Sequence, residues 1–575
     1  MTLTPESLRG EDRKTTGRRP AAALARPRTK GGTLALIVIL LVAVAAPLFA
    51  VLIRAVTGYN GQPSALPTLV DPRNLETLGN TVLLGVMVVI IATVMAAPLA
   101  FAMSWTRMRE HQWIEVLLMV PFMTPPYVMS LAWLDFVRVN GLAEQLFGPV
   151  GVAMRHAIES PFGMAFVMAS EVFTFLYLIL RNHLDSIPAS LDESAQTSGA
   201  SAAQRFRKIL APLSTTAYSL GALIVFIRAA GEFGTPVTLG NKIGFRVLVS
   251  EIYSAVTIDP LDFPTAAALS SVLLALGVTV WGVQQWISRK PTLFGGRAAK
   301  RANVTLGPIA RVGTWGWLAL VTLLSVAIPY LAIILGAMTI LRSQPLTLDN
   351  LTFDFFAIVM QPGAGLTPLQ NSATLALISA TLATVLGVAS ALTIAQLKRR
   401  WSGRLVDLLS VASDTIPAIV LAIGFIFLWN SPWLPITPYN TPVMLVIGYV
   451  VVVLPMVVQN VKNSRDSIDD RLLEAATISG AGTGYTLRRI MLPMLLPGII
   501  TGWLLAFLLA LREVVFSSLV RPASLDLLSP WIMSEFDQGH RAEAMAMTVI
   551  GVLGSVVVLV VVDTLRRRRE AVRRA

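Results

Sequence analysis

Six ionisable side chains fall inside long apolar stretches of this sequence, where a charge is costly unless it faces protein or water. Two of them, Glu232 and Glu513, are 281 positions apart, and Arg228 precedes Glu232 by one helical turn and could pair with it. Such carboxylates could line a gate or a cation route, or they could anchor helix ends to neighbouring helices. Glu171 has no counterpart at that spacing. A lone carboxylate of this kind more often makes a buried polar contact that holds helices together, although a pathway role stays open for Glu171. The full set is Asp135, Glu171, Arg228, Glu232, Arg512 and Glu513.

Other chemistry is poorly supported. There is no cysteine, and the four histidines make no pair at ligand spacing, so we expect no metal site. A loop that binds ATP phosphates needs glycine and lysine followed by serine or threonine, and none of the lysines follows a glycine. The apolar stretches hold no pair of a nucleophile and a base. We therefore expect no catalytic residue, no enzyme activity and no cofactor. The histidines are His111, His156, His183 and His540.

Composition places the chain in a membrane. It is 54% hydrophobic and 14% charged, whereas a soluble domain carries about a quarter charged residues. The first apolar run follows a leader too long for a signal peptide, so we expect a retained membrane helix. Runs long enough to cross a bilayer recur along the whole chain, which predicts an all-α membrane protein with about 12 transmembrane helices. They lie near 33–55, 79–105, 113–137, 161–180, 216–236, 264–288, 313–341, 372–396, 405–429, 440–460, 496–518 and 543–564.

The positive charges favour one orientation. If the N-terminus is cytoplasmic, 35 of the 46 lysines and arginines fall in cytoplasmic segments, 9 in external segments and 2 within helices. We therefore expect a multi-pass protein of the cell (inner) membrane with both termini in the cytoplasm. The basic N-terminal arm and the run from Arg566 to Arg569 then indicate contact with anionic membrane lipid rather than with nucleic acid.

One polar motif occurs twice in this apolar chain. The first copy, Glu193–Gly199, reads ESAQTSG, and the second, Glu474–Gly480, reads EAATISG. The copies are 281 positions apart, and each is followed at the same distance by a proline, Pro212 or Pro493. Each joins the fourth and fifth apolar runs of its half, so both face the cytoplasm in the expected orientation. A membrane protein that repeats one polar loop is expected to present that loop twice to a soluble partner.

The repeat divides the chain into two six-helix units of the same orientation. Matched prolines support this division, since Pro126 and Pro417 both lie in the third run of a unit. We expect five segments: a basic cytoplasmic arm (1–32), the first unit (33–288), a basic cytoplasmic linker (289–312), the second unit (313–564) and a basic cytoplasmic tail (565–575).

The repeated loop resembles the EAA motif in permease subunits of binding-protein-dependent ABC importers. The second copy fits every fixed position of that motif, through Leu492 and Pro493, whereas the first departs from it at Ser194 and Ala211. A chain with two units is similar to the ferric-iron, thiamine and 2-aminoethylphosphonate branches, in which one polypeptide replaces a permease dimer. The resemblance implies the type I importer fold, with two parallel six-helix repeats, and transport by alternating access.

The resemblance also implies partners: two copies of a cytoplasmic ABC ATPase, one on each loop, and an extracytoplasmic solute-binding protein. In the family this loop docks into a groove of the ATPase. Small residues leave a shallow helix surface there, and a glycine permits a sharp turn because it can adopt positive φ. An ordinary helical hairpin on the surface is the alternative interpretation. The implied docking residues are Glu193, Ala195, Gly199, Glu474, Ala475, Ala476 and Gly480.

Three functional classes compete. A secondary transporter also often has six plus six helices and would use Glu171, Glu232 and Glu513 as ion sites, but it needs no matched loops. A membrane enzyme would need a nucleophile, a base or a metal cluster. We favour the permease of an ATP-driven importer, with ferric iron as the first expected cargo because of the fused architecture. Thiamine, 2-aminoethylphosphonate and polyamines remain alternative cargoes.

Overall fold

The computed structural model describes residues 30–289, 306–397, 400–432 and 434–574. These residues form helices joined by loops, with no strand among them beyond two isolated bridges. Ten helices are long and apolar enough to cross a membrane, and two bent helix pairs bring the number of spans to as many as twelve. The expected all-α membrane fold with about 12 spans is therefore confirmed. Most of the basic arm predicted at 1–32 and of the linker predicted at 289–312 lies outside the described residues.

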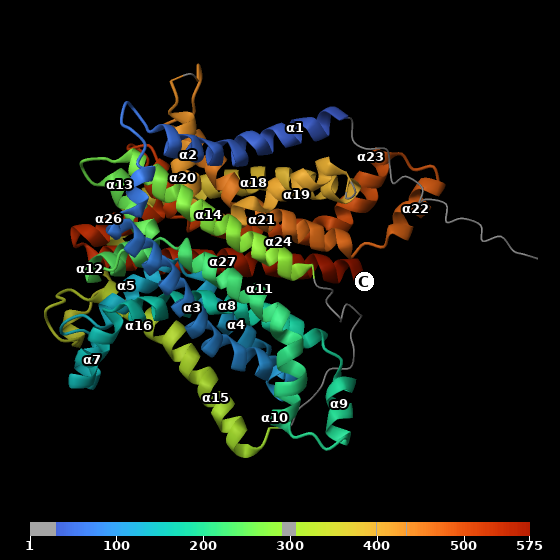
Figure 1. Ribbon diagram of the computed structural model, residues 1–575. Coiled ribbons are helices and arrows are strands. Elements are labelled where there is room, and N and C mark those ends of the chain that lie inside the picture. The colour runs from blue at the N-terminus through green and yellow to red at the C-terminus, as the bar shows by residue number, and fades with distance from the viewer. Residues whose placement is uncertain (1–29, 290–305, 398–399, 433, 575) are drawn as a thin grey trace, which may run out of the picture.

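The spans of the first unit follow the expected order along the chain (Figure 1). They are α1 (Lys30–Leu40) with η1 (Leu41–Ala45) and α2 (Ala46–Thr57), α3 (Pro72–Trp105), the pair α4 (Gln112–Met123) and α5 (Pro126–Phe136), α8 (Pro161–Ser186), η4 (Phe206–Leu210) with α11 (Ala211–Ala230), and α14 (Phe263–Ser288). Shorter helices are η2 (Leu66–Val70), η3 (Arg107–Glu110), α6 (Leu142–Phe147), α7 (Pro149–Ile158), α9 (Ala189–Thr197), α10 (Ala202–Arg205), η5 (Pro236–Gly240), α12 (Asn241–Ile243) and α13 (Leu248–Thr257).

The second unit repeats this order. Its spans are α15 (Pro308–Thr322) with η6 (Leu323–Ala327) and α16 (Ile328–Met338), α18 (Leu366–Gln396), the pair α19 (Trp401–Thr415) and α20 (Ala418–Trp429), α21 (Pro442–Asp466), η8 (Thr486–Met491) with α24 (Leu492–Leu511), and α27 (Arg541–Arg574). Shorter helices are η7 (Leu348–Asn350), α17 (Asp354–Val359), α22 (Asp470–Ile478), α23 (Thr483–Tyr485), α25 (Val515–Val520) and α26 (Leu528–Gln538).

Wide helical turns occur at matching places in the two units. The π-helical segments η1 and η6 interrupt the first spans, and η4 and η8 open the fifth spans. Each is followed by a helix with proline in its first turn. Proline has no N–H and its ring crowds the preceding turn, and a π-bulge is one way for a helix to continue past such a disruption.

The third span of each unit is bent near its proline. The axes of α4 and α5 differ by 91°, and those of α19 and α20 differ by 112°. Pro125 precedes α5 and Pro417 precedes α20, and a residue before proline is driven out of the helical conformation. Each run expected near 113–137 and 405–429 is therefore a pair of helices rather than one helix.

The fifth span is also interrupted. The helix α11 ends at Ala230 and α24 ends at Leu511, before the ends expected near 236 and 518. In each unit a short turn containing the glutamate, Glu232 or Glu513, follows the long helix, and a second helical segment then begins.

The first span of each unit packs against the other unit. In the first unit α2 packs against α20 and α1 against α19, while α16 of the second unit packs against α5 and α15 against α3 (Figure 1). The contact between α2 and α20 is close, because a Cβ atom on Gly424 would lie 2.4 Å from the Pro47 carbonyl oxygen. The two units follow one another in the sequence but interlock in space through these exchanged first helices.

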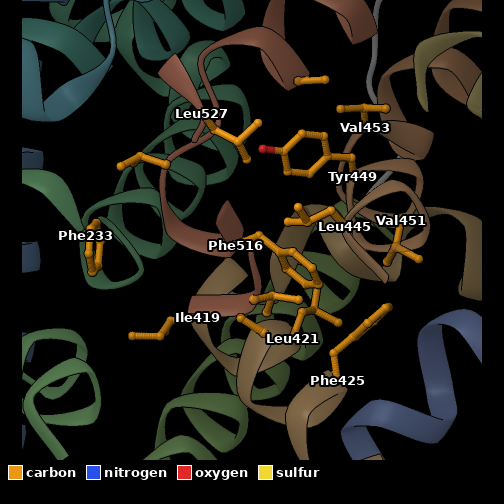
Figure 2. Close-up of a cluster of buried hydrophobic side chains, with 14 of the residues drawn as sticks. Phe233, Ile419, Leu421, Phe425, Leu445, Tyr449, Val451, Val453, Phe516 and Leu527 are labelled. Carbon is orange, nitrogen blue, oxygen red and sulfur yellow. The ribbon is translucent and has the colours of Figure 1, made fainter. Parts of the chain in front are cut away.

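One hydrophobic core contains residues of both units. Figure 2 shows part of it, with Phe233 from the first unit and Ile419, Phe425, Tyr449 and Phe516 from the second. The rings of Phe425 and Phe516 meet edge to face with their centroids 5.0 Å apart. Between helices in lipid, association depends on close packing of this kind more than on the hydrophobic effect.

Candidate functional sites: two matched loops and a central cavity

The two copies of the polar motif lie at the same end of the helix bundle. Figure 1 places α9 and α10 of the first copy, and α22 and α23 of the second, at the end where α27 carries the C-terminus. The helices α7, α12, α13 and α26 lie at the opposite end. Each loop leads directly into a fifth span, because η4 continues into α11 and η8 into α24.

The backbone turns of the two loops are the same. Gly199 has φ +82° and Gly480 has φ +75°, a conformation that costs little for glycine alone. In the first loop the N–H of Ala200 donates to the carbonyl of Ala195 at 3.0 Å. In the second, the N–H of Ala481 donates to the carbonyl of Ala476 at 3.0 Å. This is the hydrogen bond of a helix that ends in a left-handed residue, so the predicted role of the two glycines in the turn is confirmed.

The side chains around the turns differ in exposure. Glu193 and Glu474 are exposed, as is Ala475, whereas Ala195 is half-buried and Ala476 is buried. Ala476 therefore packs within the loop and does not contribute to the shallow outer surface that we expected of it.

At two positions the second loop exposes an apolar or aromatic side chain where the first exposes a polar one. Leu191 and Leu472, at matching positions, are both exposed. In the second loop Ile478 is 87% exposed and Tyr485 is 62% exposed. The first loop has the polar residues Thr197 and Gln204 at the positions that match Ile478 and Tyr485, and both are exposed.

The interior of the first loop is the more polar one. The guanidinium of Arg205 donates to the Asp192 carboxylate at 2.7 Å, and both side chains are nearly buried. At the matching positions the second loop has Leu473 and Thr486, which are buried. One loop thus holds an internal ion pair where the other holds an apolar residue and a hydroxyl.

A cavity of about 230 Å³ lies between the two units, away from the loops. Its walls include the ends of all four interrupted spans: Phe122 and Pro126 at the bend of the first unit, Thr415 and Pro417 at the bend of the second, and the turns after α11 and α24. Three of the predicted pathway residues, Glu171, Glu232 and Glu513, line it together with Arg228 and Arg512. The structure therefore brings together five of the six ionisable residues that the sequence singled out.

Glu232 and Glu513 accept equivalent hydrogen bonds from backbone N–H groups. The carboxylate of Glu232 accepts hydrogen bonds from the N–H groups of Gly234 (2.5 Å) and Thr235 (3.1 Å). The carboxylate of Glu513 accepts from the N–H groups of Phe516 (2.8 Å) and Ser517 (2.9 Å). Each glutamate caps the helical segment that follows it in its own unit, where N–H groups would otherwise lack partners. Anchoring to neighbouring helices was one of the two roles that the sequence left open for these glutamates. In the structure each glutamate binds the next helical segment of its own unit.

Glu171 differs from these two. It is 6% exposed and lines the cavity, yet among the residues that the structure describes no hydrogen bond or ion pair is found for its carboxylate. Arg512 and Arg228 lie within electrostatic range of it. The Glu171 carboxylate thus lines the cavity near two guanidinium groups, and the role that the sequence favoured for it, a buried polar contact between helices, stays a prediction.

The two arginines pair with groups of the opposite unit. Arg228 donates to Asp414 at 2.6 Å, not to Glu232 as the sequence suggested. Arg512 donates to the carbonyl oxygens of Phe122 and Thr124, the latter at 3.1 Å. Asp414 was missed by our sequence reasoning, although an acidic residue three positions before Pro417 in an apolar run is a visible signal.

The remaining ionisable candidate, Asp135, lies apart from the cavity. It forms ion pairs with Arg342, in the segment after α16, and with Arg138 at 3.4 Å. Among the described residues no group of three His, Cys, Asp or Glu side chains is arranged to hold a metal ion.

Two interlocked six-span units, with a cavity between them that several ionisable side chains line, define a membrane transport subunit built from one polypeptide. The chain belongs to the family of the binding-protein-dependent transport system inner membrane component, whose pattern matches residues 21–292 and 383–571. It is thus the permease of an ABC importer, with the predicted two-unit fusion. In this family the ATPase is a separate subunit, and a substrate-binding protein delivers the solute, so the class of function and the absence of an enzyme role stand as predicted.

Relatives of known function are distant. The chain is 25% identical to the ferric transport system permease protein FbpB of Actinobacillus pleuropneumoniae, over 82% of this chain and 68% of that protein. It is 24% identical to the Fe(3+)-transport system permease protein FbpB 2 of Haemophilus influenzae, over 92% of this chain and 97% of that protein. It is also 29% identical to the spermidine/putrescine transport system permease protein PotC of Escherichia coli, over 38% of this chain and 81% of that protein.

Proposed function

We propose that the two matched loops dock two copies of a cytoplasmic ATPase, one copy on each loop. The equal turns at Gly199 and Gly480, the exposed outer surfaces and the common end of the bundle support this proposal. Closure of the ATPase pair would draw the loops together and move α11 and α24, which continue from them. The docking residues would be Glu193, Ala195, Gly199, Glu474 and Ala475, with Ala476 and Gly480 shaping the second turn.

The cavity between the units is, on this proposal, the translocation pathway. The observation that carries it is that the cavity is bounded by the interruptions of the third and fifth spans in both units. Since the fifth spans continue from the docking loops, a movement of the loops changes the walls of the cavity. Glu171 would contact the solute directly, and Glu232 and Glu513 would hold the gate segments that follow α11 and α24. Alternating access then follows from rocking of the two units.

We infer that the cargo is a cation, with ferric iron as the first candidate. The cavity is lined by four carboxyl groups, from Glu171, Glu232, Asp414 and Glu513, against two guanidinium groups, and this balance favours a positive solute. Relatives named for ferric transport over most of this chain support iron. Relatives named for spermidine and putrescine make a polyamine the second candidate. The same balance of charge disfavours 2-aminoethylphosphonate and leaves thiamine, which is also a cation, open.

The membrane orientation is part of the same proposal. The excess of lysine and arginine on one side supports a cytoplasmic location for both termini, the linker and the loops, in contact with anionic lipid. The extracytoplasmic binding protein would then meet the end of the bundle that carries α7, α13 and α26. The unit boundaries 33–288 and 313–564 remain those proposed from the repeat.

Purification from native membranes tests the docking proposal. We expect the chain to bring with it one ATPase in two copies per permease, counted by mass spectrometry of the intact complex, and a solute-binding protein. If no ATPase is recovered even after cross-linking, the proposal that these two loops dock it is wrong.

Reconstitution tests the cargo. Liposomes that contain the permease and its ATPase, with the binding protein outside, should accumulate ferric iron when ATP is enclosed, and Glu171→Gln should slow this uptake. Val452→Gln, at the position that matches Glu171 in the second unit, is the matched control in the opposite cavity wall. Uptake of spermidine or thiamine in place of iron would overturn the assignment of iron while keeping the importer.

A further inference from the structure

Two arginines cross from the fifth span of one unit to the bent third span of the other. Arg228, in the last turn of α11, pairs with Asp414 in the last turn of α19 at 2.6 Å. Arg512, directly after α24, donates to the carbonyls of Phe122 and Thr124 where α4 ends. Each guanidinium also lies over a ring of the first unit, Arg228 over Phe175 at 5.2 Å and Arg512 over Phe122 at 5.1 Å.

These arginines are not copies of one another. At the repeat spacing the counterpart of Arg228 is Leu509 and that of Arg512 is Gly231. In the third spans, where Pro126 and Pro417 match at a spacing of 291, the counterpart of Asp414 is Met123. The two contacts nevertheless join the same two structural points, the end of a fifth span and the bend of the opposite third span. The repeat therefore does not account for their common placement.

The physical reason for a cation at each bend is the unpaired end of a helix. The last carbonyls of α4 and α19 have no partners within their own helix, and the helix dipole makes that end negative. At the end of α4 the backbone carbonyls accept the hydrogen bonds of Arg512. At the end of α19 the negatively charged Asp414 carboxylate accepts the hydrogen bond of Arg228. Both contacts lie in the cavity wall and span the two units, so they must lengthen or break if the units separate there.

We propose that Arg228–Asp414 and Arg512 with the end of α4 form a cross-unit latch that holds the two walls of the cavity together and opposes its widening. This inference rests on the proposed pathway, since it assigns to the same cavity the contacts that oppose its opening. The two arginines act as positioning residues that hold the interrupted spans of the two units together. Glu171 is the residue that contacts the solute. In the structure each guanidinium has its partners on the opposite unit, so separation of the two spans would leave both guanidinium groups without these contacts.

The absence of cysteine from the chain provides a direct test. A single cysteine at Val452, an uncharged residue of the cavity wall, would report opening by its rate of reaction with a bulky charged thiol reagent in detergent. We expect Arg228→Ala and Arg512→Ala each to raise the labelling rate by about fivefold or more, the lower end of coupling between sites. Arg73→Ala, which removes an exposed ion pair with Glu251 far from the cavity, should leave the rate unchanged.

Exchanging the charges of residues 228 and 414 distinguishes loss of the latch from a general loss of packing. Arg228→Asp and Asp414→Arg should each speed labelling, and the two together should restore the slow rate, which a loss of packing would not do. If an alanine variant fails to fold, Asp414→Asn keeps the volume of the side chain and should still speed labelling. Rates within about twofold of the parent in both arginine variants, or no recovery in the exchanged pair, would overturn the latch. Because labelling needs neither ATPase nor cargo, this result stands apart from any failure of the proposed transport function.

Discussion

The two docking loops share a backbone and differ in their side chains. Both turn at a glycine of positive φ, Gly199 or Gly480, and both close with the same 3.0 Å hydrogen bond. The first encloses the ion pair of Asp192 and Arg205 and exposes Thr197, whereas the second encloses Leu473 and exposes Ile478 at the position that matches Thr197. The comparison teaches that the glycine determines the shape of the loop, while a few neighbouring positions determine what the loop can bind.

The difference has a consequence for partners. If two identical ATPase copies dock, they meet two unequal surfaces on one chain. The second loop, with more exposed apolar area, offers the larger gain on burial, which amounts to roughly 25 cal/mol per Å². We therefore expect the second loop to contribute the larger share of the docking affinity.

The largest effect is expected from Arg205→Ala, which tests the interior of the first loop. It leaves the Asp192 carboxylate nearly buried without its ion-pair partner, which should destabilise the loop by about 3 kcal/mol. Hydrogen exchange should then quicken in the amides of 189–210, while those of 470–491 are unchanged. The double variant Asp192→Leu with Arg205→Thr copies the second loop and should recover protection. Unchanged exchange in Arg205→Ala would mean that the ion pair does not hold the loop.

Gly480→Asp is expected to have the next largest effect. A side chain at φ +75° is strained by about 1–2 kcal/mol, and the new carboxylate would lie on the docking surface. The chain should still insert, but the ATPase retained on the purified permease should fall by roughly tenfold. Gly482→Asp is the matched control, since Gly482 precedes α23 at an ordinary φ of −66° and aspartate suits that position. Normal retention in Gly480→Asp would count against docking at this loop.

Ile478→Thr removes the apolar side chain that most distinguishes the second loop. Loss of about 1 kcal/mol of burial on docking should weaken ATPase binding by roughly fivefold. The reciprocal change, Thr197→Ile, should strengthen docking at the first loop. Titration of the ATPase onto reconstituted permease would measure both. If both variants bind as the parent does, the outer surfaces do not account for any difference between the loops.

Gly199→Asp should have the smallest effect. The strain at φ +82° matches that at Gly480, but this loop contributes less to the affinity, so a loss of about twofold in ATPase retention is expected. Equal losses in Gly199→Asp and Gly480→Asp would show that the two loops dock equally, and the proposed asymmetry would then be wrong.

Much of the architecture could be predicted because its signals are local. Apolar length indicated the spans, and exact spacing indicated the repeat, including the turns at Gly199 and Gly480. Prolines marked the bent third spans, but the angle depends on packing that no local pattern contains. The pairing of Arg228 with Asp414 joins residues 186 positions apart, whereas the pairing that we first considered, with Glu232, was the nearest one in the sequence. The exchange of first helices between units is equally non-local.

The packing of the first helices against the opposite unit determines when each unit can complete its folding during synthesis. The helix α2 enters the membrane early, yet its partner α20, with Gly424 against Pro47, is made more than 370 residues later. At about 5–20 residues per second, the ribosome needs roughly 20–75 s to supply that partner. During this interval the face of α2 that α20 will cover must rest against lipid or an insertion chaperone, so the first unit cannot mature before the first three spans of the second have been translated.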